Sequence, residues 1–384
     1  MPNFRFIDLF AGIGGFHIAM SQLGGECVFA SEIDKFAAET YKQNFNIDSL
    51  NDIRTVDALS IPPHDVLCAG FPCQSFSKAG KQGGFDDTRG TLFFDIKRIL
   101  AVHKPKYIIL ENVRNLVSHD KGRTWKIISK TLKDLGYIIT EKPIIVSPHQ
   151  IGVPQLRERV YILGVHKDFT NCKKIYLSVP KAKKNLLSGK SILNGTSDPK
   201  YHISDYEEYV LNAWNDFING IDAKVLGFPI WAKEFAQNTD ISQFPKWKQN
   251  FILKNRELYV RNRTFIDGWL NRYNHLKDFV PTHTKFEWQA GYDINSVWEG
   301  IIQFRPSGIR VKRPTEFPAL VAMVHIPIVG WKKRRLTPRE VANLQSFPDD
   351  FKVNANPQQA FKQFGNAVNV KVVKTLAQQL FEQT

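Results

Sequence analysis

A cysteine with the surroundings of a nucleophile lies in the first quarter of the chain. Cys73 sits within G-F-P-C-Q-S-F-S (70–77), directly after the apolar run 65–70. The thiolate is the reactive form of cysteine, and neighbouring cations stabilise it. The residues that follow include hinge glycines and several cations, which suit a loop that closes over a polyanion. Cys73 is therefore the candidate for covalent chemistry.

Three charged side chains could assist this nucleophile. Glu111 ends an apolar run, so we expect its carboxylate at the same sheet edge as Cys73. Burial would raise the pKa of Glu111 and allow it to act as an acid. Arg157 and Arg159 alternate at the start of the run 159–166 and share one strand face, from which they can orient a carboxylate and hold a carbonyl. Taken singly, each also fits an exposed strand end or a surface ion pair.

A glycine-rich turn lies near the start of the chain. The run F-I-D-L-F leads into Ala11-Gly12-Ile13-Gly14-Gly15, ahead of a helical pattern. In a doubly wound sheet this turn brings a nucleotide-like ligand against bare backbone, where a Cβ would block the approach. Glu32 ends the next apolar run 20 residues after Gly12, a spacing at which a carboxylate can accept hydrogen bonds from both ribose hydroxyls. Dehydrogenases share this layout, and a lone glycine cluster can be an ordinary tight turn.

Alternating apolar runs and helical patterns must position these groups. The expected strands are 4–10, 26–31, 65–70, 106–112, 137–146 and 159–166. The expected helices are 15–23, 34–45, 91–102 and 123–135. This alternation predicts an α/β fold with a doubly wound, mostly parallel sheet covered on both faces. The carboxyl ends of its strands form the ligand side.

The composition changes in the middle of the chain. Seven of the eight tryptophans lie between 214 and 331, and the α/β alternation ends near residue 170. We expect a smaller, irregular second domain inserted here, followed by helices at 336–348 and 364–383 that return to the first domain. The predicted parts are a cofactor-binding and catalytic domain at 1–168, the inserted domain at 169–331, and the C-terminal helices at 332–384.

Charge and cysteine content narrow the class of protein. The 52 lysines and arginines exceed the 37 aspartates and glutamates, which gives a formal charge of +15 and suits a polyanionic partner such as nucleic acid. Cys27 and Cys68 lie inside expected strands, as small buried residues do. The four cysteines show neither disulfide-rich nor metal-type spacing, so we expect a reducing interior and no metal. No run approaches the ~20 apolar residues of a membrane span, which predicts a cytoplasmic protein without a membrane partner.

Taken in order, these segments resemble the cytosine-5 DNA methyltransferase family of bacterial restriction-modification systems. The motifs are D-L-F-A-G-I-G-G, G-F-P-C-Q-S-F-S, E-N-V, Q-L-R-E-R and, near the end, Q-F-G-N-A-V. The resemblance covers 4–166 and 332–384 closely and the stretch between them hardly at all. It implies an S-adenosylmethionine-dependent methyltransferase fold, S-adenosyl-L-methionine as methyl donor with S-adenosyl-L-homocysteine as product, and double-stranded DNA as substrate.

The resemblance also implies the walls of a donor pocket. Glu32 would take the ribose, Ile33 would pack on adenine, and Asp52 with Ile53 would address the adenine edge. The C-terminal motif would complete the pocket formed by the first domain. The full set of implied donor-binding residues is Phe10, Gly12, Gly14, Glu32, Ile33, Asp52, Ile53, Leu92, Asn366 and Val368.

The chemistry that the resemblance implies uses the charged groups singled out above. Cys73 would add to carbon 6 of cytosine, because carbon 5 is a poor nucleophile until that addition. Glu111 would protonate or hydrogen-bond ring nitrogen 3, Arg159 would hold the oxygen at carbon 2, and Arg157 would brace the site. The target base must be flipped out of the duplex to reach the thiolate. The neighbours of the nucleophile expected to support it are Pro72, Gln74 and Ser77.

Two basic stretches of the middle region are candidates for DNA contacts. Residues 301–315 contain no acid, and residues 246–263 contain six cations against Glu257. A solvated charged surface fits any single one of these cations equally well. The family's recognition region often has a Thr-Leu or Thr-Val pair, whereas the nearest pair here is Ala319-Leu320. The candidates for phosphate and base contacts are Arg305, Arg310, Lys312 and Arg313.

Three other functions stay open at this point. An RNA cytosine methyltransferase would use the same cysteine chemistry, although the large middle region favours sequence-specific duplex DNA. A nicotinamide-dependent oxidoreductase would explain the glycine turn and Glu32, but it has no use for Cys73, Glu111 and Arg159 together. A non-catalytic DNA-binding relative would not need those three residues intact. Within a restriction-modification system, we expect a monomer that protects host DNA, with a cognate endonuclease encoded nearby.

Overall fold

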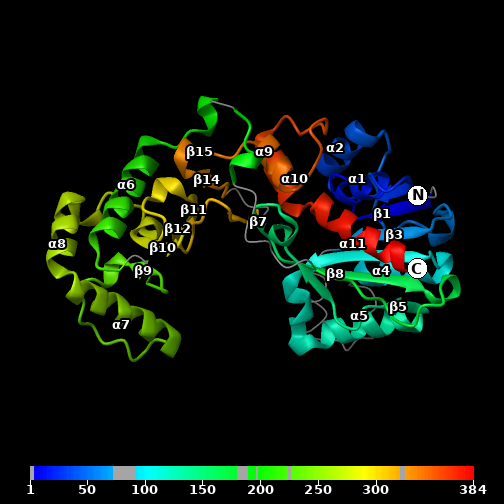
Figure 1. Cartoon of the computed structure of the whole chain (residues 1–384), viewed down its shortest axis with the longest axis horizontal. Helices are drawn as coiled ribbons and strands as arrows, with labels where there is room; N and C mark the ends of the chain where they lie inside the picture. The colour runs from blue at the N-terminus through cyan, green and yellow to red at the C-terminus, as the bar shows by residue number, and fades with distance from the viewer. Residues whose placement is uncertain (1–3, 72–91, 180–188, 196–197, 224–225, 321–324) are drawn as a thin grey trace. The chain divides into compact units, whose positions relative to one another are not determined.

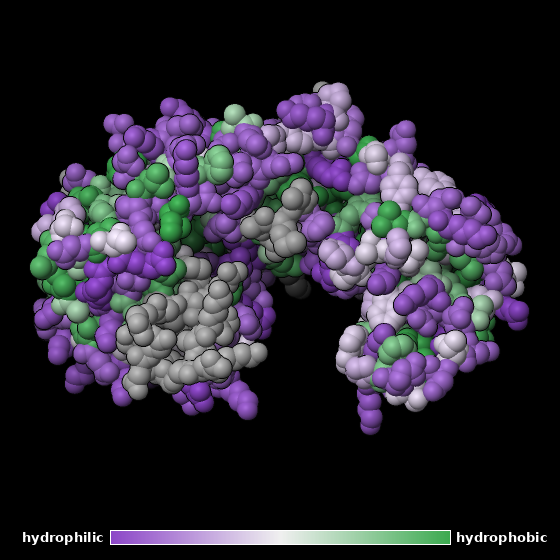
Figure 2. Space-filling model, turned by 180° about the vertical axis from the view of Figure 1, so that it is seen from behind, coloured by the Kyte–Doolittle hydropathy of each residue, from purple (hydrophilic) through white to green (hydrophobic). Residues whose placement is uncertain are grey.

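The chain folds into two compact units. The computed structural model describes residues 4–71, 92–179, 189–195, 198–223, 226–320 and 325–384. Unit 1 consists of Met1–Leu187, Ala319–Met323 and Pro338–Thr384, and unit 2 consists of Ser188–Pro318 and Val324–Thr337. Hydrophilic residues cover much of the visible surface of each unit (Figure 2). Within the described ranges, no helix has both the length and the apolar character needed to cross a bilayer.

The unit boundaries differ from those that the composition suggests. The sequence places the chain from residue 169 onward in the middle region, but the described part of its first segment, 169–179, belongs to unit 1. Tyr176 N donates to Gln383 Oε1 at 3.0 Å, and Ser178 N donates to Gln379 Oε1 at 2.9 Å. Residues 332–337 belong instead to unit 2, where a short strand ends the sheet. Such hydrogen bonds leave no trace in hydropathy, so the composition alone does not indicate where the two units divide.

Unit 1 is built on a seven-stranded mixed sheet of order β2-β1-β3-β4-β8-β5, with β6 also paired to β8. Strands β2, β1, β3 and β4 are parallel, and β8 runs antiparallel to β4 and to its other neighbours. The predicted α/β class is confirmed. The expected strand 137–146 is two short strands, because Pro143 lacks the N–H that a continuous ladder requires. The strands are β1 (Phe4–Leu9), β2 (Gly25–Ser31), β3 (Val66–Gly70), β4 (Tyr107–Val113), β5 (Tyr137–Ile139), β6 (Ile144–Val146), the separate β7 (Gln155–Leu156) and β8 (Arg159–His166).

Helices cover both faces of this sheet (Figure 1). Alternate residues of β1 point to opposite faces, so Ile7 and Leu9 join the core cluster of α4 and α5, while Phe6 contacts His17 of α1 with ring centroids 5.5 Å apart. The expected helix 364–383 is interrupted, because Asn369 accepts a hydrogen bond from Val372 N at 3.1 Å and starts a new helix. The helices are α1 (Gly15–Ser21), α2 (Lys35–Phe45), α4 (Leu92–His103), α5 (Arg123–Asp134), α9 (Pro338–Leu344), α10 (Pro357–Asn366) and α11 (Val370–Gln383).

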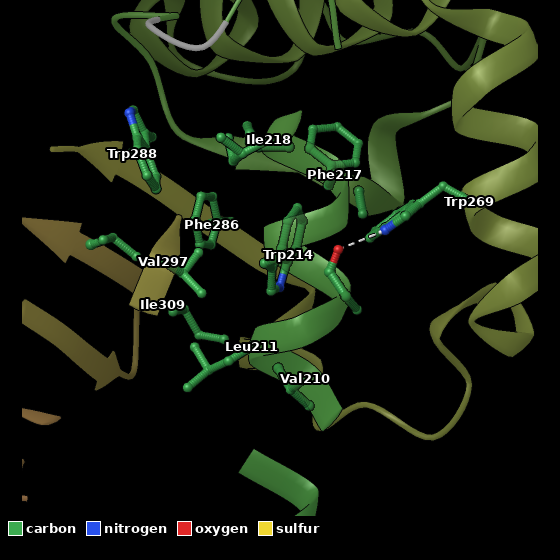
Figure 3. Packing of buried hydrophobic residues seen from close by; sticks show 14 of the residues in the cluster. Val210, Leu211, Trp214, Phe217, Ile218, Trp269, Phe286, Trp288, Val297 and Ile309 are labelled. Atoms are coloured by element: carbon green, nitrogen blue, oxygen red, sulfur yellow. Dashed lines mark hydrogen bonds between the residues drawn. The ribbon is translucent and has the colours of Figure 1, made fainter. Parts of the chain in front are cut away.

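Unit 2 packs three helices against a six-stranded sheet of order β15-β14-β11-β12-β10-β9. Its core is aromatic: Trp214 stacks on Phe286 at 4.8 Å, and the indole N–H of Trp269 donates to the Ala213 carbonyl at 2.8 Å (Figure 3). The middle region is therefore a regular fold and not an irregular one. Its elements are α6 (Asp205–Gly220), α7 (Lys246–Arg261), α8 (Arg263–Arg272), β9 (Ile230–Trp231), β10 (Lys285–Gln289), β11 (Ile301–Arg305), β12 (Gly308–Lys312), β13 (Phe317–Pro318), β14 (Ile328–Val329) and β15 (Arg334–Arg335).

Candidate active site

Unit 1 contains a cavity of about 980 Å³ at the carboxyl ends of its parallel strands. This is the edge where open α/β sheets bind ligands. The cavity brings together both groups of residues singled out in the sequence. The predicted residues that line it are Phe10, Gly12, Glu32, Ile33, Asp52, Ile53, Leu92, Glu111, Arg157, Arg159 and Asn366.

Gly12 and Gly14 of the glycine turn have different surroundings in the structure. Gly12 has φ +56°, and a Cβ built on it would meet nothing within 4 Å, so its backbone lies open to the cavity. Gly14 has φ +89°, and a Cβ there would lie 2.2 Å from the Phe45 ring of α2. Gly14, predicted as a pocket wall, instead permits close packing of the turn on α2. Val368, also predicted as a wall, is 7% exposed and packs against Gly15 outside the cavity lining.

Glu32 connects the turn to the end of β2. One carboxylate oxygen accepts a hydrogen bond from Gly12 N at 2.8 Å, and the other accepts from Asp34 N at 2.7 Å. Each oxygen keeps capacity for a further donor, since an ionised carboxylate offers about four lone-pair positions. The next residue, Ile33, leaves 65% of its surface exposed beside the cavity. An exposed isoleucine next to a fixed carboxylate suits a ligand with a flat apolar part and adjacent hydroxyls.

An arginine of α4 holds the loop that carries Asp52 and Ile53. Arg98 Nη2 donates to the Ile53 carbonyl at 2.9 Å, and Nη1 donates to the Val56 carbonyl at 2.8 Å. Asp52 itself pairs through both oxygens with Arg54, which lowers the pKa of Asp52. Arg98 lines the cavity but was not among the predicted residues. The two carbonyls that it binds lie more than 40 residues away in sequence, and no local pattern indicates them.

The start of the cysteine loop is fixed next to Glu111. Gly70 at the end of β3 pairs with Glu111 at the end of β4. The adjacent Asn112 donates through Nδ2 to the Phe71 carbonyl at 2.7 Å, which anchors the last described residue before the loop. Pro72, Cys73, Gln74 and Ser77, the predicted nucleophile and its neighbours, lie outside the described residues.

Glu111 is a buried carboxylate with one charged partner. Its Oε1 lies 3.1 Å from Nε of Arg159, and the residue is 9% exposed. Burial raises the pKa of Glu111, and the nearby guanidinium groups of Arg159 and Arg157 offset only part of that effect. A carboxyl group in this position can hold a proton at a higher pH than an exposed glutamate can. Glu111 therefore has the raised pKa expected of an acid at this edge of the sheet.

The hydrogen bonds of the Arg157 guanidinium go to main-chain carbonyls. The guanidinium donates to the carbonyls of Leu320 at 2.9 Å, Gly365 at 2.8 Å and Ala367 at 3.0 Å. Burial lowers the pKa of Arg157 to about 9, and the charge of Arg159 acts in the same direction. Arg157, which lies between β7 and β8, therefore links this segment to the C-terminal end of α10 and to the Ala319-Leu320 pair.

The predicted DNA contacts all lie on unit 2, and acids accompany each of them. Arg310 and Arg305 flank Glu287, with closest approaches of 2.6 and 3.6 Å. Lys312 lies 4.0 Å from Glu316. Arg313 pairs with Asp293 and donates to the Ala290 carbonyl at 3.0 Å. Within 246–263, Arg256, Arg261 and Arg263 likewise pair with acids of unit 2.

Comparison with known proteins identifies the family. The family model "C-5 cytosine-specific DNA methylase" matches residues 4–382, nearly the whole chain. The chain belongs to this family. It is a DNA (cytosine-5-)-methyltransferase, and the nicotinamide-dependent reading of the glycine turn is set aside. Among the part of the chain that the structure describes, no cluster of three or more histidine, cysteine, aspartate or glutamate side chains could hold a metal ion.

The alignments with relatives of the methyltransferase cover nearly its full length. The Type II methyltransferase M.AluI of Cellulosimicrobium cellulans is 35% identical over 97% of this chain and 91% of its own. The Type II methyltransferase M.HpaII of Haemophilus parainfluenzae is 36% identical over 99% and 90%. The crystal structure of DNMT2 from Spodoptera frugiperda has a TM-score of 0.58 and 22% identity over 98% of this chain and 99% of that one, which shows the shared fold. The recognised motifs thus belong to a restriction-modification type of methyltransferase.

Proposed function

We propose that this methyltransferase transfers a methyl group from S-adenosylmethionine to carbon 5 of one cytosine within a specific duplex DNA sequence, with Cys73 as nucleophile. The observation that carries the proposal is the shared cavity of unit 1. It contains the open backbone of Gly12, the fixed carboxylate of Glu32 and the buried Glu111–Arg159 pair. A donor site and an acid within one cavity are what a direct methyl transfer requires.

The donor site fits S-adenosylmethionine by its chemistry. Glu32 can accept hydrogen bonds from the ribose hydroxyls, the exposed Ile33 can cover the adenine, and Asp52 borders the same region. Phe10, Ile53, Leu92 and Asn366 would complete the walls. When bound, this donor supplies a methyl group activated by a sulfonium. No metal is needed for that chemistry, so we expect none.

The protein groups would activate the cytosine ring. The Cys73 thiolate forms a bond to carbon 6, and the electron pair that moves to carbon 5 makes it nucleophilic. Glu111, whose pKa is raised by burial, donates its proton or a hydrogen bond to ring nitrogen 3. Arg159 holds Glu111 in place and binds the oxygen at carbon 2. Arg157 keeps β8 and the turn after α10 in register. Loss of the carbon 5 proton after transfer then releases the thiolate.

Access to the cytosine would require base flipping, because an in-duplex base cannot present carbon 6 to a thiolate in a cavity. Pro72, Gln74 and Ser77 would support the flipped base. We assign target recognition to the middle region 169–331, with phosphate and base contacts from Arg305, Arg310, Lys312 and Arg313. The named Type II relatives support a role in protecting host DNA from a cognate restriction endonuclease. A monomer acting on DNA in the cytoplasm is the simplest form of this function.

A methyl-transfer assay tests the proposal. Purified enzyme is incubated with labelled S-adenosylmethionine and a pool of duplex DNA of varied sequence, and the modified positions are mapped. Cys73→Ala should lower the rate of methyl transfer by at least about 10³-fold. Cys172→Ala is the matched control and should retain activity, because Cys172 is not among the residues that line the cavity and its thiol donates to the Gln383 carbonyl. An active Cys73→Ala variant would refute the mechanism, and transfer to tRNA but to no duplex would refute the substrate.

A further inference from the structure

The two faces of the central strands of unit 2 differ in character. Strands β10, β12 and β11 lie side by side, and residues paired across neighbouring strands point to the same face. The following row packs in the core cluster of unit 2: Phe286, Ile309 and Phe304. One residue further along the pairing, the side chains point to the opposite face, and they are polar. That row consists of Glu287, Arg310 and Gln303.

Glu287 holds the guanidinium of Arg310 along one edge. Its Oε2 accepts from Nε of Arg310 at 2.8 Å and lies 2.6 Å from Nη2. About a quarter of each side chain is exposed, 25% for Arg310 and 27% for Glu287. The arginine is thus oriented by an acid on one side, with Gln303 paired to it on the other.

This face carries more positive than negative charge. The three strands bring four cations to it, Lys285, Arg305, Arg310 and Lys312, against Glu287 on β10 and Glu316, which lies 4.0 Å from Lys312. Nη1 of Arg305 lies 3.6 Å from Glu287 Oε2 and has no hydrogen-bond partner among the described residues. Burial lowers the pKa of Arg305, and the charge of Arg310 lowers it further. A polyanion is the partner that complements this surface.

The position of the acid indicates which kind of contact Arg310 makes. A cation that only binds phosphate gains nothing from an adjacent carboxylate, because the carboxylate repels the phosphate. A cation that reads a base edge needs a fixed orientation, because the guanidinium presents its donors as a rigid fork. Guanine offers two acceptors to such a fork in the major groove. Glu287 supplies the orientation and also disfavours a phosphate at the same place.

We propose that Arg310 reads a guanine in the target DNA, that Glu287 is the positioning residue that orients its guanidinium, and that Gln303 contacts the same or the neighbouring base pair. The inference rests on the proposed function, because it requires duplex DNA as substrate. It adds to that function a recognition row, which consists of Glu287, Arg310 and Gln303 at paired positions of β10, β12 and β11.

The test maps methylation by the full-length enzyme on duplex DNA of randomised sequence. Arg310→Gln should reduce the preference for guanine at one position of the recognised sequence at least tenfold and leave the other positions unchanged. Glu287→Gln should weaken the preference at that same position, and Glu287→Asp should restore part of it. Arg310→Lys keeps the charge but loses the fork, so it should behave like Arg310→Gln.

Matched controls come from an ion pair elsewhere in unit 2. Arg272→Gln and Asp216→Asn break a pair of 3.1 Å between α8 and α6 and should keep the wild-type pattern. Circular dichroism melts show which variants are folded. The inference fails if folded Arg310 and Glu287 variants keep the guanine preference as the controls do, while wild type still methylates DNA in one sequence context. A wild type that methylates RNA but no duplex overturns the proposed function and the inference together.

Discussion

Polar side chains are held differently in the cavity of unit 1 and on the sheet face of unit 2. In unit 1, Arg157 and Arg98 donate to main-chain carbonyls. In unit 2, Arg310 and Arg305 meet the side chain of Glu287. Main-chain carbonyls persist whatever the neighbouring sequence, whereas a side-chain partner disappears with one substitution. The cavity is therefore built for constant geometry, and the sheet face can change its specificity through single residues.

The largest expected effect concerns Glu111, which pairs with Arg159 in the cavity of unit 1. Glu111→Gln should slow methyl transfer by about 10³-fold, because glutamine cannot supply the proton that ring nitrogen 3 requires. Duplex binding should stay within about threefold of wild type, since Glu111 contributes to chemistry and not to contacts with the helix. Single-turnover methylation and fluorescence anisotropy measure the two quantities. Lost binding with intact chemistry would reverse the assignment.

A second experiment compares arginines of the two units directly. Arg157→Met should lower the free energy of unfolding by about 3 kcal/mol, because it leaves buried carbonyls without donors. Arg313→Met should cost under about 1 kcal/mol, because Arg313 is 37% exposed and water can replace its contacts. Urea denaturation followed by circular dichroism measures both changes. Equal losses of unfolding free energy in the two variants would contradict the expected difference between Arg157 and Arg313.

The loop of Asp52 offers a smaller effect. Arg98→Gln should weaken the binding of S-adenosylhomocysteine about tenfold, because the carbonyls of Ile53 and Val56 lose their shared donor and the loop is no longer held. The rate of transfer at saturating donor should change little. Isothermal calorimetry and initial rates separate these quantities. Lys97→Gln, which removes the neighbouring charge on α4, serves as control. Unchanged donor binding in Arg98→Gln would show that Arg98 does not position the donor site.

The smallest expected effect is on the pH dependence of stability. Burial lowers the pKa of His17 to about 4, so the folded state resists a proton that the unfolded chain accepts near pH 6.5. Stability is present above pH 6.5 and is lost as the pH falls, by about 1 kcal/mol between pH 6.5 and 5.5. His17→Phe should remove this loss. His283→Phe in unit 2 should change it less, since Glu207 offsets part of the burial effect there. Urea titrations at the two pH values measure the difference.

Local pattern singled out some of the residues that line the cavity, namely Gly12, Glu32, Glu111, Arg157 and Arg159, whereas the other predicted lining residues came from the family resemblance. The spacing of apolar runs placed Glu111 at the same sheet edge as the residues before Cys73, and Gly70 does pair with Glu111. The same pattern could not separate Gly12, which faces the cavity, from Gly14, which packs on α2. Both glycines adopt positive φ, and only the position of Phe45 distinguishes them.

Contacts between distant segments stayed invisible to the sequence. Arg98 and Asn112 bind carbonyls 41 to 45 residues away, and Arg157 reaches carbonyls more than 160 residues away. Glu287 became part of a recognition row only through the pairing of three strands. Hydropathy and spacing report which face a residue occupies but not which residue lies opposite it.

The sequence by itself determined the α/β class and the family and supplied the candidate groups for the reaction, because periodic hydrophobicity and contiguous motifs are local properties. The tertiary structure decided which arginines hold backbone, where the units divide, and which polar residues stand beside one another on unit 2. These features depend on strand register and on burial. Both arise only when segments far apart in the chain pack together and lose water.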